Sequence, residues 1–314
     1  MCTGILIKTK NNKYIFARTL EFGIPFDWVQ YCSDYIIGTI GFLEDLKKGY
    51  MTDGLNKHGL FVGTFFFPHY NSQYNIKDIK SKINIETGEV NEFLLNKCRN
   101  VKDVLRILTK LNILETKIHN QLFSLHWAVI DKYGNSIVIE IKNGIPHYYN
   151  NTANVITNSP SFPYHLYELS KYKDLSKYNL PNSLSEGTGA LGLPGDSSSK
   201  SRFVRANFYQ KNLPTPIDSQ QGMKAILRIM HDFDIPLGSV VDRKTKQMEA
   251  TQYTVAYSIN DFYNEYAKYG NKFVNNRWNY TDNPVKLCND ENEKLYGLPL
   301  IFILVCIGGY YFCK

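Results

Sequence analysis

The sequence predicts an α+β protein in which sheets stack on each other and helices lie outside them. Segments with strand character lie early and late in residues 1–282, and segments with helical periodicity lie between them. The strand segments alternate apolar and polar residues, whereas the helical segments repeat apolar residues every three or four positions. No internal repeat is visible, so residues 1–282 are expected to form one domain.

The first two predicted strands form a hairpin that starts at the beginning of the chain. Apolar and polar residues alternate up to Thr9, a turn follows at Asn11-Asn12, and the alternation resumes between Tyr14 and Glu21. The hairpin therefore places the first residues of the chain beside the end of the second strand.

The next segments predict two further strands with a turn between them. Residues 34–42 form a strand punctuated by glycine, and Asp53-Gly54-Leu55-Asn56 is typical of a turn. Gly59–Phe67 is an almost wholly apolar run that stops at Pro68. Such a run predicts a strand that is covered on both faces.

The remaining segments alternate between helices and strands. Helices are predicted at residues 83–98, 101–111 (with Asn100 as a cap), 164–173, 203–210 and 223–231. Strands are predicted at 122–130, 136–141, 155–157 and 253–259, with one more ending near Tyr280. Residues 183–201 are rich in Ser and Gly, which indicates a long loop.

Composition excludes several classes of function. The chain has 314 residues and a net charge of +7, and 43% of its residues are hydrophobic, as in an ordinary globular protein. No nucleic-acid-reading motif accompanies the charge, so we expect no nucleic-acid partner. The six cysteines form no CxxC pair and have no histidine at ligand spacing, so no zinc site is expected. Nothing at the start resembles a secretory signal, which predicts reduced thiols and a cytoplasmic protein.

Cys2 is the candidate nucleophile. If Met1 is removed, the thiol and the free α-amine belong to one residue. An α-amine titrates near pH ~8, so it can accept the thiol proton at neutral pH. Arg18 on the neighbouring strand can stabilise negative charge on sulfur, and Glu21 can orient the amine. His126 and Asp131 offer an alternative Cys-His-Asp arrangement, although a strand histidine among apolar residues is more often part of the core.

Five motifs recur in the order found in the choloylglycine hydrolase family, from residue 2 to about residue 260. They are Met1-Cys2-Thr3, Phe16-Ala17-Arg18-Thr19, Asp53-Gly54-Leu55-Asn56, Thr157-Asn158-Ser159-Pro160, and the string Gly187–Asp196 followed by Ser201-Arg202-Phe203. The chain resembles this family, which includes bile salt hydrolases and penicillin V acylases and belongs to the N-terminal nucleophile hydrolases. The resemblance implies a four-layer αββα sandwich of two mainly antiparallel sheets, and a homotetramer.

The resemblance also implies roles for individual residues. Cys2 matches the family's nucleophile, and Arg18 matches the arginine near its sulfur. Asn158 matches the asparagine whose amide helps form the oxyanion hole. Arg202 matches the arginine that supports the nucleophile. No metal or organic cofactor is implied.

Two positions depart from the commoner family pattern. Glu21 stands where the family usually has aspartate, and it keeps the charge on a longer side chain. Phe66 stands where Asn or Tyr is frequent, and its backbone N–H is the second expected oxyanion donor. Phe66 removes a polar group that would face the substrate, which weakens the case for strict bile-salt specificity. With Phe22, Phe26, Trp28 and Phe65, it is expected to line an apolar acyl pocket.

The expected activity is hydrolysis of a linear amide of the bile-salt, penicillin V or other N-acyl type through a thioester acyl-enzyme. N-acyl amino acids, N-acyl lactones and phenoxyacetyl amides are candidate substrates. The alternative is a membrane-associated binding protein that kept the fold and lost turnover. Retention of Met1 would favour that alternative, because it masks the amine.

The end of the chain has a different composition. Residues 283–295 are polar and predict a linker, and residues 296–313 contain no charged residue before the final Lys314. As a helix, this run would extend roughly 27 Å, just short of the hydrocarbon thickness of a bilayer. Two predictions remain open for 296–314, namely a C-terminal membrane anchor and a last strand or helix docked on the domain.

Overall fold

The computed structural model describes residues 1–23, 27–42, 49–68, 74–75, 77–118, 121–181, 184–243, 246–274, 277–282 and 286–287. Phe26, the tail at 296–314 and all of the linker at 283–295 except 286–287 lie outside these residues. Within the described part, no helix is both long and apolar enough to cross a bilayer. The membrane anchor therefore stays a prediction.

The first sheet is built around the hairpin predicted at the start of the chain. β1 (Cys2–Lys8) pairs antiparallel with β2 (Tyr14–Phe22), which places Cys2 opposite Leu20. β14 (Val155–Ile156) flanks β1, and β16 (Met248–Ser258) flanks β2. The sheet also contains β15 (Val240–Val241), β17 (Tyr263–Val274), β18 (Arg277–Asp282) and β19 (Lys286–Leu287). Because β14 ends two residues before Asn158, its pairing with β1 brings Asn158 toward Cys2.

The second sheet is antiparallel and has the strand order β13-β12-β11-β6-β5-β4-β3. Its strands are β3 (Asp27–Cys32), β4 (Ile36–Phe42), β5 (Tyr50–Asn56), β6 (Leu60–Phe66), β11 (Leu125–Asp131), β12 (Ser136–Lys142) and β13 (Ile145–Asn150). The turn predicted at Asp53–Asn56 is wrong, because these residues complete β5 and the chain reverses after Asn56. Asp53 and Gly54 pair with Gly63 and Val62 of β6, so they belong to a central strand.

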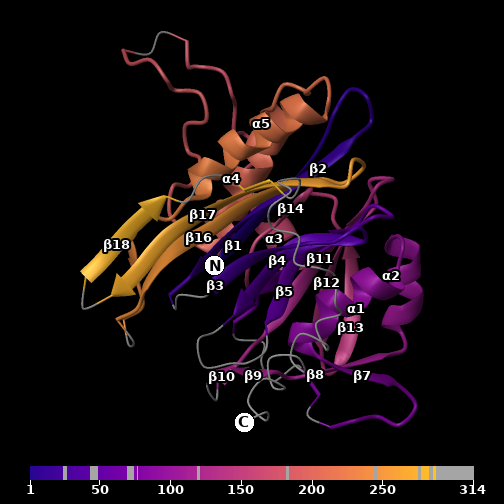
Figure 1. Ribbon diagram of the computed structural model, residues 1–314. Helices are drawn as coiled ribbons and strands as arrows, with labels where there is room; N and C mark the ends of the chain where they lie inside the picture. Colours follow the sequence, from indigo (N-terminus) through magenta and orange to yellow (C-terminus); the bar gives the residue numbers. More distant parts are fainter. Residues whose placement is uncertain are drawn as a thin grey trace.

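Helices cover the outer face of each sheet, which gives the predicted four-layer αββα arrangement (Figure 1). α4 (Ser199–Asn212) and α5 (Ser219–Met230) lie on the first sheet. α1 (Val90–Lys97) and α2 (Val101–Leu108) lie on the second. α3 (Phe162–Leu169) packs on α4 through Phe162 and Phe203, whose ring centroids are 6.1 Å apart.

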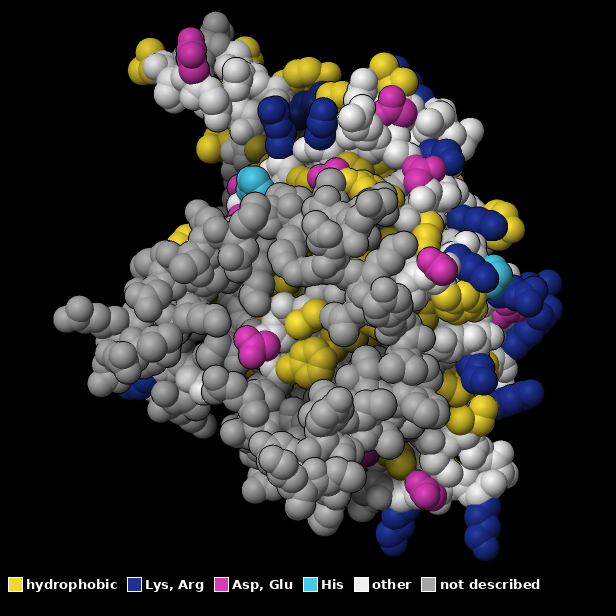
Figure 2. Space-filling view, in the orientation of Figure 1, with side chains coloured by type: hydrophobic (Ala, Val, Ile, Leu, Met, Phe, Trp, Pro, Cys, Tyr) yellow, Lys and Arg dark blue, Asp and Glu magenta, His cyan; other side chains and the backbone are white. Residues whose placement is uncertain are grey.

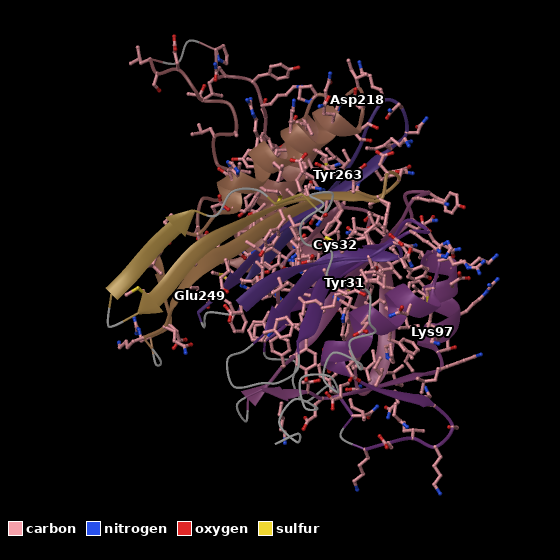
Figure 3. The ribbon with its side chains drawn as sticks, viewed as in Figure 1. Tyr31, Cys32, Lys97, Asp218, Glu249 and Tyr263 are labelled. Carbon is pink, nitrogen blue, oxygen red and sulfur yellow. The ribbon has the colours of Figure 1, made fainter. Side chains whose placement is uncertain are left out.

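Local signals explain where most helices begin. The side chains of Asn100, Ser198 and Asp218 each accept a hydrogen bond from the backbone three residues later, as N-caps do. Asp218, at the start of α5, is labelled in Figure 3. Capping by Ser198 starts α4 four residues before the predicted start at Phe203. This places Arg202 inside the helix.

The helix predicted at 83–98 is only partly correct. Its first residues form β7 (Ile83–Glu86), which pairs in parallel with β8 (Leu111–Leu114), and a short 3₁₀ turn (Thr87–Glu89) precedes α1. The Thr87 hydroxyl donates to the Leu114 carbonyl over 2.6 Å, which ties the turn to β8. A β9–β10 pair (Lys117–Ile118, Gln121–Leu122) and a 3₁₀ turn after α5 (His231–Phe233) complete the described elements.

The two sheets pack closely beside Cys2. A Cβ at Gly4 would stand 2.6 Å from the ring of Phe16 and 2.8 Å from that of Phe65 on the opposite sheet. Phe16 also packs against Phe61 across the interface, with ring centroids 4.6 Å apart. Only a glycine allows this approach, so the two sheets pack closely next to the first residues of β1.

Candidate active site

Cys2 begins β1 and its thiol is buried between the two sheets. Side chains on one face of a strand recur at every second residue, so Cys2 shares its face with Leu20 and Arg18 of the paired strand. Arg18 Nη2 lies 3.2 Å from Cys2 Sγ. Arg18 Nη1 donates to the Thr64 carbonyl of the second sheet over 2.7 Å. The hairpin register therefore places a guanidinium directly against the sulfur.

Asp53 is the counter-charge of Arg18, and sequence reasoning missed it. Arg18 Nη1 lies 3.3 Å from Asp53 Oδ2, and both side chains are fully buried. The hydroxyls of Tyr253 and Tyr257 donate to the same carboxylate. Burial raises the pKa of both tyrosines well above its usual value, so both hydroxyls stay protonated and remain donors. Burial alone would lower the pKa of Arg18, but neighbouring groups, including Asp53, raise it.

A second guanidinium approaches Cys2 from the helical side of the sheet. Arg202 of α4 donates through Nη1 to the Cys2 carbonyl and, over 2.8 Å, to the Thr3 hydroxyl. Its Nη2 donates to Asn158 Oδ1 over 2.7 Å. Burial lowers the pKa of Arg202. The contact between Arg202 and Cys2 thus runs through the Cys2 backbone and not through its sulfur.

Glu21 lies on the same side of the sheet as Arg202. Its backbone N–H donates to the Met1 carbonyl over 2.9 Å, so Met1 extends the ladder between β1 and β2. Its Oε1 accepts from the Thr251 hydroxyl over 3.3 Å, and its buried Oε2 has no hydrogen-bond partner among the described residues. The Glu21 charge raises the pKa of both arginines, though other groups contribute more at Arg18.

Asn158 joins the backbone of Cys2 to the end of β6. Its Oδ1 accepts from the Cys2 N–H over 2.7 Å as well as from Arg202. Two donors on Oδ1 direct the amide nitrogen away from them, and Nδ2 donates to the Phe66 carbonyl over 2.7 Å. One hydrogen of Nδ2 remains for another acceptor.

The Phe66 N–H points toward the same edge as its carbonyl. Phe66 is opposite Leu125 of β11, but the Leu125 N–H and carbonyl both bond to the Tyr74 hydroxyl. In the next residue pair of this ladder, the Phe67 N–H donates to the Ser124 carbonyl. Phe66 therefore occupies a non-hydrogen-bonded position of the β6–β11 ladder, and its N–H and carbonyl face away from β11.

An apolar pocket opens beside Cys2. Its lining includes the expected Phe22, Trp28 and Phe66 and adds Phe123 and Leu125. Phe22, Phe66 and Phe123 form a cluster with ring centroids 5.9 to 6.5 Å apart. Phe65 is not part of the lining, because it points to the opposite face of β6 and lies under the Arg18 guanidinium at 4.6 Å.

The structure does not form the alternative Cys-His-Asp arrangement. His126 contacts the Thr157 carbonyl through Nε2 over 2.9 Å. Asp131 accepts from backbone N–H groups of Val101, Tyr133 and Asn135 and therefore shapes a turn and a helix start. Among the described residues, no group of three or more His, Cys, Asp and Glu side chains is placed to hold a metal ion.

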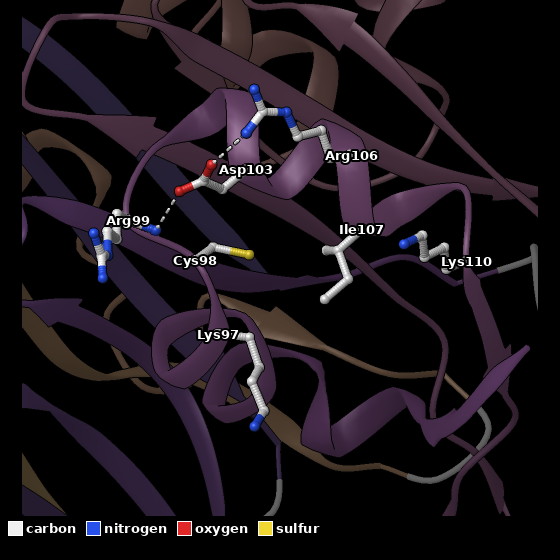
Figure 4. A pocket seen from close by; sticks show the side chains of 7 residues that line it. All are labelled: Lys97, Cys98, Arg99, Asp103, Arg106, Ile107 and Lys110. Carbon is white, nitrogen blue, oxygen red and sulfur yellow. Dashed lines mark hydrogen bonds and ion pairs between the residues drawn. The ribbon is translucent and has the colours of Figure 1, made fainter.

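The other described cysteines lie in different surroundings. Cys98 is free and lines a pocket with Lys97, Arg99, Arg106 and Lys110 (Figure 4), on the side of the molecule where Lys and Arg side chains gather in Figure 2. Burial raises the pKa of its thiol to about 12, so it is a poor nucleophile at neutral pH. Cys32, labelled in Figure 3, is disulfide-bonded, which differs from the reduced thiols expected from the sequence.

Comparison with known proteins identifies similar chains and structures. Residues 2–278 match the model of the linear amide C–N hydrolases, choloylglycine hydrolase family. An uncharacterized protein of Paramecium bursaria Chlorella virus 1 is 36% identical over 82% of this chain and 94% of its own length. A bile salt hydrolase/transferase of Clostridium perfringens is 27% identical over 91% of this chain and 96% of its own.

Solved structures agree with this match. The C2A mutant of the conjugated bile acid hydrolase from Clostridium perfringens superposes with a TM-score of 0.75 at 27% identity, covering 91% of this chain and 96% of that one. Penicillin V acylase from Agrobacterium tumefaciens has the same fold, with a TM-score of 0.64 at 18% identity over 85% of this chain and 83% of that one. This chain therefore belongs to the choloylglycine hydrolase family of linear amide C–N hydrolases.

Proposed function

We propose that the protein hydrolyses a linear amide C–N bond with Cys2 as its nucleophile. The observation that carries this proposal is the contact of 3.2 Å between Cys2 Sγ and the Arg18 guanidinium. The Asn158 amide and the Phe66 N–H lie at the adjoining end of β6. A sulfur beside a cation, with donors nearby for a developing oxyanion, is what acyl transfer to a thiol requires.

The base in this mechanism is the α-amine that removal of Met1 would expose on Cys2. The nitrogen that donates to Asn158 Oδ1 as the Cys2 peptide N–H would become this amine, which takes the thiol proton while Sγ forms a bond to the amide carbon. The C–N bond then breaks as the amine returns that proton to the leaving nitrogen, and a thioester remains. Water next attacks the thioester and gives a proton to the amine. The C–S bond breaks, and the thiol is restored.

The charged side chains near Cys2 lie on two faces of the first sheet and have different proposed roles. Arg18 faces the sulfur, so negative charge that develops there meets charge of opposite sign. Arg202 and Glu21 lie on the other face, where Arg202 holds the Cys2 carbonyl and Asn158 Oδ1. The free Nδ2 hydrogen of Asn158 and the Phe66 N–H then meet the oxyanion. Each such donor is typically worth about 3 kcal/mol in the barrier.

The pocket indicates the acyl group. Its wall of aromatic and leucine side chains suits an apolar acyl group. Phenoxyacetyl amides and N-acyl amino acids meet this description. The relatives named for bile salts and for penicillin V supply the two reference substrates.

Mass spectrometry of the processed protein tests the proposal. Incubation with a panel of N-acyl amides is expected to add one acyl group to Cys2 and to release the amine. Cys2→Ala should abolish both signals, whereas Cys98→Ala should retain them because that thiol lies in a different pocket. Full turnover by Cys2→Ala would refute the mechanism. Failure of every amide to acylate the processed protein would favour the binding-protein alternative.

A further inference from the structure

The peptide groups on both sides of Asn158 are held by buried side chains. His126 Nε2 lies 2.9 Å from the Thr157 carbonyl, and His165 Nε2 lies 2.8 Å from the Asn158 carbonyl. The Asn158 N–H donates to the Ser199 hydroxyl over 2.9 Å. Two consecutive carbonyls and the N–H between them thus each have a side-chain partner. We propose that His126 and His165 are positioning residues that keep Asn158 in place as an oxyanion donor, an inference that rests on the proposed function.

The contacts fix the tautomer of each imidazole. A carbonyl oxygen only accepts hydrogen bonds, so Nε2 must carry the hydrogen in both rings. Both rings are almost completely buried, and the Nδ1 atom of each has no hydrogen-bond partner among the described residues. His126 Nδ1 stands 3.7 Å from Glu140 Oε1, beyond hydrogen-bond range. Apart from a 3.3 Å contact between His165 Nε2 and Ser199, the hydrogen bonds of the two rings go to the carbonyls around Asn158.

Ring stacking connects these histidines to the other groups of the site. His126, on β11, stacks on Phe67 at 4.3 Å with the ring planes 18° apart. His165, on α3, stacks on Phe203 at 4.8 Å with the planes 13° apart. Phe67 follows Phe66, and Phe203 follows Arg202. The same rings that hold the backbone of Asn158 therefore pack beside the second oxyanion donor and beside the arginine that bonds Oδ1.

These contacts explain how Asn158 can be positioned accurately, although the strand before it, β14, has only two residues. β14 contributes few ladder bonds, so the ladder alone leaves the segment after Ile156 weakly held. The imidazole and hydroxyl contacts replace the missing ladder. Accurate placement matters, because a displacement of about 1 Å at a reacting group can lower a rate by about 100-fold.

The test separates oxyanion stabilisation from nucleophile reactivity. His165→Phe keeps the stack on Phe203 and removes the Nε2 donor, and His165→Gln restores a donor near that position. Acylation by an amide substrate needs the oxyanion donors, whereas alkylation of Cys2 by iodoacetamide does not. We expect His165→Phe to slow acylation by about 10- to 100-fold, with KM and the alkylation rate within about twofold of wild type. His165→Gln should recover part of the loss, and His147→Phe, on an exposed strand, should match wild type.

Two further measurements test whether Asn158 is positioned by these contacts. Ser199→Ala removes the acceptor of the Asn158 N–H from a half-buried position, and it should reproduce the slower acylation if His165→Phe fails to fold. Crystal structures of the processed wild type and variants should show Asn158 Nδ2 displaced relative to Cys2 Sγ. An equal loss of acylation and alkylation, or an unmoved Asn158, would overturn the positioning role. The crystallographic result holds even if the wild type hydrolyses no amide, in which case only the proposed function fails.

Discussion

Replacing Asp53 by asparagine tests how much the buried pair with Arg18 contributes to the protein. The substitution keeps the shape of the side chain and removes its charge. Arg18 then remains fully buried with its nearest counter-charge gone, although Nη1 still donates to the Thr64 carbonyl. The hydroxyls of Tyr253 and Tyr257 also lose a charged acceptor.

The expected loss of stability depends on how deeply the ion pair is buried and not on the distance between its charged atoms. Removing one partner of a buried ion pair costs about 3–5 kcal/mol, because the remaining charge is uncompensated in a poorly solvated site. The pair between Arg106 and Asp103 on α2 has the same separation of 3.3 Å, but its side chains are 67% and 28% exposed. An exposed pair is worth about 0–1 kcal/mol. Asp103→Asn is therefore a matched control.

Urea denaturation of the two variants measures the difference. We expect Asp53→Asn to lower the free energy of unfolding by about 3–5 kcal/mol, a large share of the about 5–15 kcal/mol typical of a folded domain. Asp103→Asn should change it by less than about 1 kcal/mol. If the two variants lie within about 1 kcal/mol of each other, the reasoning that Asp53 neutralises a buried cation is refuted.

Three more predictions concern the site. Asn158→Ala should lower kcat by about 10²- to 10³-fold, as stopped-flow assays can check. Because burial lowers the pKa of His165 from 6.5 to about 4, the unfolded chain binds more protons in this interval, and stability falls as the pH drops from 6.5 to 4. The loss is at most about 3 kcal/mol, and urea titrations at both ends should show a weaker pH dependence in His165→Phe. Phe66→Asn should retain hydrolysis, because the donor at this position is a backbone N–H, and should shift preference toward more polar acyl groups in a competition assay.

The residue pattern predicted β1, β2, β4, β6, β11 and β12, which are strands of seven to nine residues. The exceptions have physical causes. Asp53-Gly54-Leu55-Asn56 has the composition of a turn, but Asp53 is neutralised by a charge from the other sheet, which no local pattern reveals. Residues 83–86 have the periodicity of a helix, and they form a strand only because β8 lies beside them in parallel. In both cases a partner distant in sequence overrides local preference.

Some residues of the candidate site could be predicted from the sequence, and others could not. The hairpin register alone predicts that Arg18 and Cys2 share a face, since both can be counted from the turn at Asn11-Asn12. Asn158 and Arg202 came from the resemblance, because their contacts with Cys2 span 156 and 200 residues. His165 had no signal of its own. Its role depends on α3 packing against the segment that follows β14.

The contacts of Cys2 connect its sulfur and its backbone nitrogen to different parts of the candidate site. A strand residue presents its side chain to one face of the sheet and its backbone nitrogen to the neighbouring segment. Cys2 presents its sulfur to Arg18 between the sheets and its nitrogen to Asn158 Oδ1, which Arg202 approaches from α4. An internal residue has that nitrogen tied up in a peptide bond, as Cys2 does while Met1 is attached. If Met1 is removed as proposed, we expect the same contacts to hold Cys2 before and after that step, so that only the release of its nitrogen distinguishes the two forms.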